Sequence, residues 1–201
     1  MYKLICVSNR HIFYDVFGKN APFESRIRDI LSCGIDVILR ENDLDEEEYY
    51  ALLCRIGDSR VIAHTYADAA RRFGCSAVHL PLGILRSGNV SDISSVGSSV
   101  HSAAEAQEAE ALGADHITAG HVFATDCKKG LEPRGLRFIS EVSAAVKIPV
   151  YAIGGISPEN APEPVAAGAA GVCVMSGFMR CVSPRDYIDT FKGYKSTRRS
   201  I

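Results

Sequence analysis

The sequence lacks paired cysteines, a strong charge imbalance and long apolar runs. Its seven cysteines are scattered and never form a CxxC pair, so neither a disulfide framework nor a cysteine zinc site is expected. No apolar run approaches the ~18 residues of a membrane-spanning helix, and the apolar start at Met1–Val7 is too short for a signal peptide. These absences predict a cytoplasmic protein that does not bind a membrane.

The formal net charge is -2 and the sequence pI is about 6.3. A chain with so little excess charge has no general basic surface, so nucleic acid is not an expected partner. The basic segment at residues 195–201 is expected to be a solvated tail. The remaining residues 1–194 are long enough to bury one core and are predicted to form a single domain.

Short apolar runs recur along the chain and predict strands. Most are β-branched and nearly continuous, as expected for strands covered on both faces. They are Leu4–Val7, Val37–Leu39, Val61–Ala63, Ala77–Leu80, Val96–Val100, Ile117–Ala119, Val150–Ile153 and Gly171–Met175. Helical spacing separates them, most clearly over Phe23–Cys33, Glu46–Ile56, Ala103–Leu112 and Leu136–Val146. The segment Leu82–Ser94, rich in Gly, Ser and Asn, fits a helix least well.

Alternating strands and helices require a parallel sheet with right-handed crossovers. Glycines that follow several helices, namely Gly34, Gly74, Gly113 and Gly168, are predicted C-caps that turn the chain into the next strand. The number of repeats favours an α/β fold with a closed (βα)8 TIM barrel over an open sheet. In that fold, chemistry takes place at the carboxyl ends of the strands.

One histidine follows a predicted strand end directly. His121 comes after Gly120 and leads into a loop that contains Thr125, Cys127 and Lys128. Histidine can take and return a proton near neutral pH, so His121 is the candidate acid-base residue. Lys128 is expected to meet a substrate carboxylate or phosphate, whereas a nucleophilic Cys127 would need a base that the sequence does not supply.

The loops after the seventh and eighth predicted strands resemble a phosphate site. Gly154 and Gly155 follow one strand, and Ser176 and Gly177 follow the other. Glycines let the backbone approach an anion, and N–H groups at the start of the next helix can bind it. Glycine pairs also serve tight turns. The prediction of a phosphate site therefore rests on their position, after the two strands whose loops usually bind phosphate in this fold.

The other histidines allow plainer readings. His116 starts a strand and is expected to be structural, and His79 interrupts an apolar run as a core histidine would. His11 and His64 are predicted to lie in loops after the first and third strands, at the mouth or the surface, while His101 could support the site. The acidic run Asp43–Glu48 is read as an N-cap at Asp45 followed by a favourable first turn. No spacing of His, Asp or Glu indicates a metal site.

Several motifs together resemble the thiamine phosphate synthase superfamily over about Tyr2–Phe178. They are Leu39–Glu41, Ala77–Leu80, Ser99–Ser102, Ala152–Ile156 and Gly168–Ser176. Synthases of this superfamily hold magnesium with an Asn-Asp pair after strand three and an Asp after strand four. Here these places read His64-Thr65 and Pro81–Leu85, and only Arg40 remains of the pyrophosphate clamp.

The segment Gly120–Gly130 instead resembles the thiazole tautomerase (TenI) branch. That resemblance implies an isomerase of thiamin biosynthesis, without cofactor or metal, that aromatises the thiazole carboxylate phosphate made by thiazole synthase. It implies His121 as the proton carrier, and a phosphate site of Gly154, Gly155, Ser176 and Gly177. It further implies substrate contacts from Ser99, Thr125 and Lys128, and either a carboxylate contact or a loop-supporting role for Arg40. Family members commonly pair, so a homodimer or higher homo-oligomer is expected. A residual synthase and a non-catalytic regulatory protein that binds thiazole phosphates are the alternatives.

Overall fold

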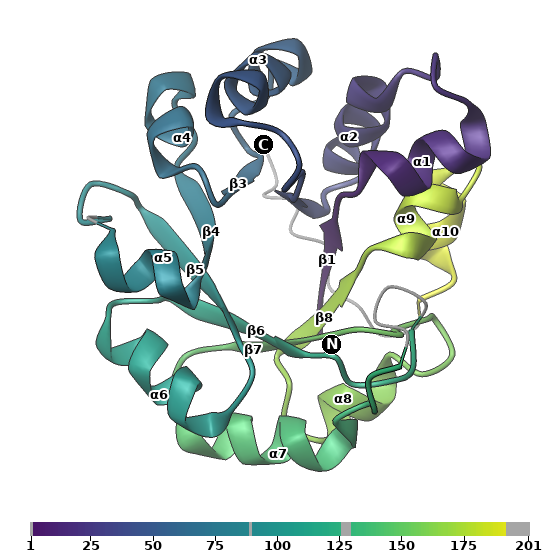
Figure 1. Cartoon of the computed structure of the whole chain (residues 1–201). Coiled ribbons are helices and arrows are strands. Elements are labelled where there is room, and N and C mark those ends of the chain that lie inside the picture. Colours follow the sequence, from purple (N-terminus) through teal and green to yellow (C-terminus); the bar gives the residue numbers. More distant parts are fainter. Residues whose placement is uncertain (1, 89, 126–129, 192–201) are drawn as a thin grey trace.

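The computed structural model describes residues 2–88, 90–125 and 130–191. Eight parallel strands close into a barrel in sequence order, with β8 paired to β1. Figure 1 shows the strands at the centre and the helices around them. The strands are β1 (Lys3–Val7), β2 (Asp36–Leu39), β3 (Ile62–His64), β4 (Ala77–Pro81), β5 (Ser95–Val100), β6 (His116–Gly120), β7 (Val150–Ile153) and β8 (Gly171–Val174). The predicted (βα)8 barrel is therefore confirmed.

Successive side chains of a strand point alternately into two cores, which explains the continuous apolar runs. Ile5 and Val7 of β1 belong to a cluster inside the barrel, whereas Leu4 and Cys6 belong to the cluster between barrel and helices. Because successive side chains of a strand point to opposite faces, both faces must be apolar when both are buried. Ile38 of β2 likewise points inward.

The helices surround the barrel. They are α1 (Arg10–Phe17), α2 (Phe23–Ser32), α3 (Glu46–Ile56), α4 (Ala67–Phe73), α5 (Leu82–Ser87), α6 (Ala103–Ala111), α7 (Gly135–Ala145), α8 (Pro162–Ala166), α9 (Ser176–Arg180) and α10 (Pro184–Asp189). The predicted C-cap glycines all have positive φ. Asp45 caps α3 in a capping box with Glu48, as expected for the acidic run. In the part of the chain that the structure describes, no helix is long and apolar enough to cross a membrane.

Helix α1 was not predicted, and it alters the position of one histidine. Asn9 caps this helix by accepting a hydrogen bond from the backbone N–H of Ile12 at 3.0 Å. His11 therefore lies in the first turn of α1, and His64 is the last residue of β3. The expectation that both lie in loops was wrong. Strand β3 extends one residue beyond the predicted run Val61–Ala63, and α1 begins at Arg10, directly after its N-cap.

Candidate active site

A cavity of about 1130 Å³ opens where the strands end. Its lining comes from the carboxyl-terminal parts of the strands, from the loops that follow them, and from helices α1 and α9. The lining includes Arg40, His64, His79, Ser99, His101, Thr118, His121, Thr125, Gly154, Gly155, Ser176 and Arg180. The cavity thus occupies the face on which a barrel of this kind carries its chemistry.

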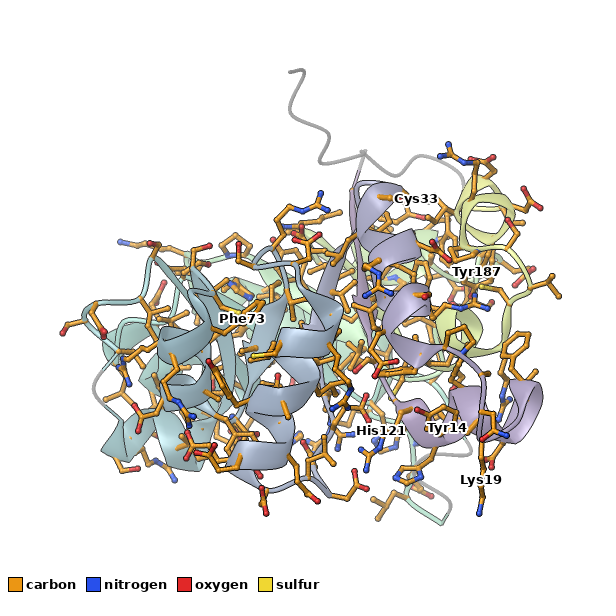
Figure 2. All side chains as sticks on the ribbon, turned by 90° about the horizontal axis from the view of Figure 1, so that it is seen from above. Tyr14, Lys19, Cys33, Phe73, His121 and Tyr187 are labelled. Carbon is orange, nitrogen blue, oxygen red and sulfur yellow. The ribbon has the colours of Figure 1, made fainter. Side chains whose placement is uncertain are left out.

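His121 lies in the wall of this cavity and is only 7% exposed. Figure 2 shows it at the same end of the barrel as Tyr14 and Lys19, away from Cys33. Its Nε2 is 3.4 Å from the carbonyl oxygen of Leu131. Since a carbonyl oxygen can only accept, a hydrogen bond at this contact is donated by Nε2, and in that tautomer Nδ1 is free to accept a proton.

The His121 loop is fixed to the neighbouring β7 loop by its backbone. Val122 N–H donates to the Ile153 carbonyl at 3.0 Å, and Phe123 N–H donates to the Gly154 carbonyl at 2.9 Å. A Cβ on Gly154 would lie 2.4 Å from His121 Cβ, and one on Gly155 would lie 2.5 Å from the Ala124 carbonyl oxygen. The glycine pair therefore has a packing role, since it lets the loop carrying His121 approach β7.

Hydrogen bonds from Arg134 hold the far end of the same loop. Arg134 N–H donates to the His121 carbonyl at 3.0 Å, and the Arg134 guanidinium donates to the His101 carbonyl at 2.6 Å. The His101 ring in turn places Nδ1 3.3 Å from the Gly120 carbonyl. His101 thus supports the segment before His121 in addition to lining the cavity.

The predicted phosphate-binding residues come together in part. Gly154, Gly155, Ser176 and Thr125 all line the cavity. Gly177 is the second residue of α9, and a Cβ there would meet the Tyr187 hydroxyl rather than open space. Lys128, like Cys127, lies outside the described residues.

The floor of the cavity is a hydrogen-bonded group of His79, Ser99 and Thr118. His79 Nε2 lies 3.0 Å from Ser99 Oγ and 3.1 Å from Thr118 Oγ1, and the two hydroxyls lie 3.2 Å apart. Burial, with smaller contributions from neighbouring histidines, holds the pKa of His79 well below its usual value. His79 is thus a neutral core histidine, as predicted, and it also fixes the hydroxyl of Ser99.

His64 and Arg40 form the wall opposite His121, because β2 and β3 lie across the closed barrel from β6. His64 Nδ1 is 2.7 Å from Thr65 Oγ1. Burial first, and then the Arg40 guanidinium, lower the pKa of His64 to about 4, so the ring is neutral at neutral pH. Arg40 is anchored through its backbone, whose N–H donates to Ser8 Oγ at 2.9 Å.

The charge of the cavity wall is one-sided. Among the described lining residues there is no Asp or Glu, whereas Arg40 and Arg180 each contribute a guanidinium. Magnesium prefers carboxylate and water oxygens. Within residues 2–88, 90–125 and 130–191, no group of three or more His, Cys, Asp or Glu side chains is placed to hold a metal ion. The described residues therefore do not fit the magnesium site of a synthase.

Several lining residues were not singled out from the sequence, among them Asn9, Thr118 and Arg180. Thr118 could have been found, because it lies two residues before Gly120 on β6 and so points to the same face. Arg180 follows its strand by six residues and carries no local signal. His116 starts β6 and is buried below the cavity, as expected of a structural residue.

The model of the family described as thiamine monophosphate synthase matches residues 4–178. The thiamine-phosphate synthase of Chlorobium luteolum is 35% identical over 157 residues, which cover 73% of this chain and 72% of that protein. The thiamine-phosphate synthase of Caldanaerobacter subterraneus subsp. tengcongensis is 32% identical over 174 residues, covering 80% and 81%. Among solved structures, a thiamine phosphate pyrophosphorylase from Pyrococcus furiosus matches with a TM-score of 0.76 and 27% identity, covering 95% of this chain and 94% of that chain.

Proposed function

The chain belongs to the thiamine monophosphate synthase family, and within that family we propose that it acts as a thiazole tautomerase. The substrate would be a non-aromatic thiazole that bears a carboxylate and a phosphorylated hydroxyethyl arm. The reaction moves one proton from ring carbon 2 to the exocyclic carbon and yields the aromatic ring. It needs no redox change and no leaving group, so a single acid-base residue can perform it.

The observation that carries this proposal is the combination of His121 with a cavity wall that lacks described carboxylates. Transfer of a pyrophosphate-activated group needs a cation to neutralise the leaving group, and the described lining offers no carboxylate to hold one. A proton transfer needs only a basic nitrogen and groups that orient the ring. The resemblance of the Gly120–Gly130 loop to the tautomerase branch supports the same reading.

Under this proposal the residues divide by role. His121 Nδ1 would take the proton from ring carbon 2 and return it to the exocyclic carbon. Gly154, Gly155, Ser176 and Gly177 remain the proposed phosphate site. Arg40 would contact the substrate carboxylate. The ring would be contacted by Ser99, Thr125 and Lys128.

The test is turnover of freshly made thiazole synthase product without added magnesium, followed by the absorbance of the aromatic thiazole. Wild type should convert it well above the spontaneous rate, and His121→Asn should lose about 10²–10⁴-fold in rate, the usual cost of removing an acid-base residue. Asn keeps a similar size and hydrogen-bonding capacity, so an unchanged melting temperature would assign the loss to chemistry. Conversion at the spontaneous rate by wild type would overturn the proposal.

A thiamine-phosphate synthase is the second candidate, because the similar proteins of Chlorobium luteolum and Caldanaerobacter subterraneus subsp. tengcongensis are named as such synthases. It predicts magnesium-dependent coupling of a pyrimidine pyrophosphate to the thiazole phosphate, with pyrophosphate released. The same assay mixtures distinguish the two reactions, because only this one requires magnesium and a second substrate. If the protein binds thiazole phosphates tightly and catalyses neither reaction, the result supports the third alternative, a non-catalytic regulatory protein.

A further inference from the structure

Arg180 is an arginine in the cavity wall with no role in the proton transfer proposed above. It is the last residue of α9, is exposed, and lines the cavity. No described Asp or Glu forms an ion pair with it. By contrast, Arg71, Arg72 and Arg86 elsewhere on the surface all pair with carboxylates.

The short helix α9 places Arg180 on the side that faces the cavity. Ser176 and Arg180 are four residues apart and therefore lie on one helical face, and both line the cavity. Phe178 and Met179 are fully buried on the other side. The Phe178 ring packs edge-on against Tyr187 at a centroid distance of 5.3 Å. This packing holds α9 in place, so the side of the helix that faces the cavity carries both Ser176 and Arg180.

The distribution of charge indicates what Arg180 meets. Arg40, at the end of β2, is a second guanidinium in the wall, and β1 separates it from β8 in the closed barrel. Two cations at separate points of a cavity whose described lining has no carboxylate suit a ligand with two anionic groups. Guanidinium is well matched to phosphate, with which it forms paired charge-assisted hydrogen bonds.

We propose that Arg180 binds the phosphate arm of the substrate and selects phosphorylated over unphosphorylated thiazoles. The inference rests on the proposed function, and it assigns the two anionic ends of the substrate: phosphate toward Arg180 and Ser176, carboxylate toward Arg40. Arg180 contacts the arm remote from the reacting carbons, so it contributes binding and orientation and does not carry the proton.

The experiment measures binding by calorimetry to wild type, Arg180→Gln and Arg185→Gln. Arg185 is the matched control, because it is an exposed arginine of α10 outside the cavity lining. The probes are the aromatic thiazole carboxylate with its phosphate, the same compound without the phosphate, and inorganic phosphate. Arg180→Gln should weaken binding of the phosphorylated compound about tenfold or more, as expected for loss of a charge-assisted contact. Binding of the unphosphorylated compound should not change, and Arg185→Gln should behave as wild type.

Equal binding of the phosphorylated compound by wild type and Arg180→Gln would overturn the inference. Equal weakening of both thiazoles would also overturn it, since Arg180 would then act through the shape of the cavity. If wild type binds neither thiazole, the proposed function fails, and inorganic phosphate still decides the role of Arg180. In that case weaker phosphate binding by Arg180→Gln supports the site, and equal binding by the two proteins refutes it.

Discussion

At the scale of the residue, a buried phenol holds together the strand ends that carry Arg40 and His64. Tyr49 of α3 is 1% exposed. Its hydroxyl donates to the Leu39 carbonyl at 2.7 Å and accepts from the His64 N–H at 2.8 Å. Burial raises the pKa of Tyr49 far above its usual value. The phenol therefore stays neutral and keeps both hydrogen bonds over the whole working pH range.

We predict that Tyr49→Phe destabilises the fold by about 1–3 kcal/mol, because a buried carbonyl and a buried N–H each lose their partner. Urea unfolding with the midpoint and slope compared to wild type measures the change. Tyr14→Phe is the matched control, since the Tyr14 hydroxyl has no hydrogen bond to another described residue. Equal midpoints for both variants would show that the Tyr49 hydroxyl contributes nothing.

Sequence reasoning worked at this scale where a residue's place in the pattern determines its surroundings. His79 interrupts an apolar run, so its burial followed from strand periodicity. His121 follows a strand end, so its place in the cavity wall followed from the fold. The partners of His79 could not be predicted, because Ser99 and Thr118 come from strands whose register the sequence does not specify. Arg180 was missed because one exposed arginine on a short helix looks like any other.

At the scale of the element, the loop after β7 supports the loop after β6. We predict that Gly154→Ala displaces His121, because the added Cβ would lie 2.4 Å from His121 Cβ and 2.7 Å from its Cα, at a φ of +103°. Overpacking and unfavourable backbone geometry together should cost about 1–3 kcal/mol or more. Turnover should fall further than stability alone explains, since the acid-base residue itself is moved.

Gly83→Ala is the control for this prediction. Gly83 lies in α5, is exposed, and a Cβ there would have no neighbour within 4 Å. Alanine in a helix is favoured over glycine by up to about 1 kcal/mol, so this variant should be as stable as wild type or more stable. A Gly154→Ala variant with normal turnover and normal stability would refute the proposed support of His121 by the β7 loop.

The strands and main helices were predictable because each carries its own periodicity, and several helices are followed by a glycine with positive φ. Helix α1 was not predicted, although Asn9 followed by apolar residues at helical spacing is a recognisable start signal. The glycine pair at Gly154 was read as a phosphate site on its position alone. Its contact with His121 depends on the distance between two loops, which no local pattern encodes.

At the scale of the whole molecule, closing the barrel stacks rings that are far apart in sequence. His64 packs on His79 with ring centroids 6.0 Å apart, and His79 packs on His116 at 5.7 Å. His116 then meets Tyr151 at 5.6 Å. Gly97 of β5 makes room for this column, because a Cβ there would lie within 2.4 Å of both His79 and His116. The column runs from the cavity floor into the barrel interior.

This column makes the fold sensitive to acid. Burial is the main cause that lowers the pKa of His64 to about 4 and lowers the pKa values of His79 and His116. Because each folded-state pKa lies below the unfolded value, the unfolded chain binds protons more readily. Stability is therefore complete above about pH 6.5 and falls as the pH drops toward 4. For His64 alone the loss reaches about 3 kcal/mol at pH 4.

We predict that His64→Gln reduces the difference in unfolding free energy between pH 7 and pH 4.5, whatever its effect at pH 7. The measurement is urea unfolding at both pH values. Val78→Ala is the control, because Val78 is fully buried in β4 but cannot titrate, so it should lower stability equally at both. An unchanged pH dependence in His64→Gln would mean that water reaches His64 well enough to keep its charged form solvated. Water at this site would also raise the local dielectric constant and weaken the attraction between Arg40 and an anion bound beside it. The stability measurement therefore also tests how strongly the cavity can bind an anionic ligand.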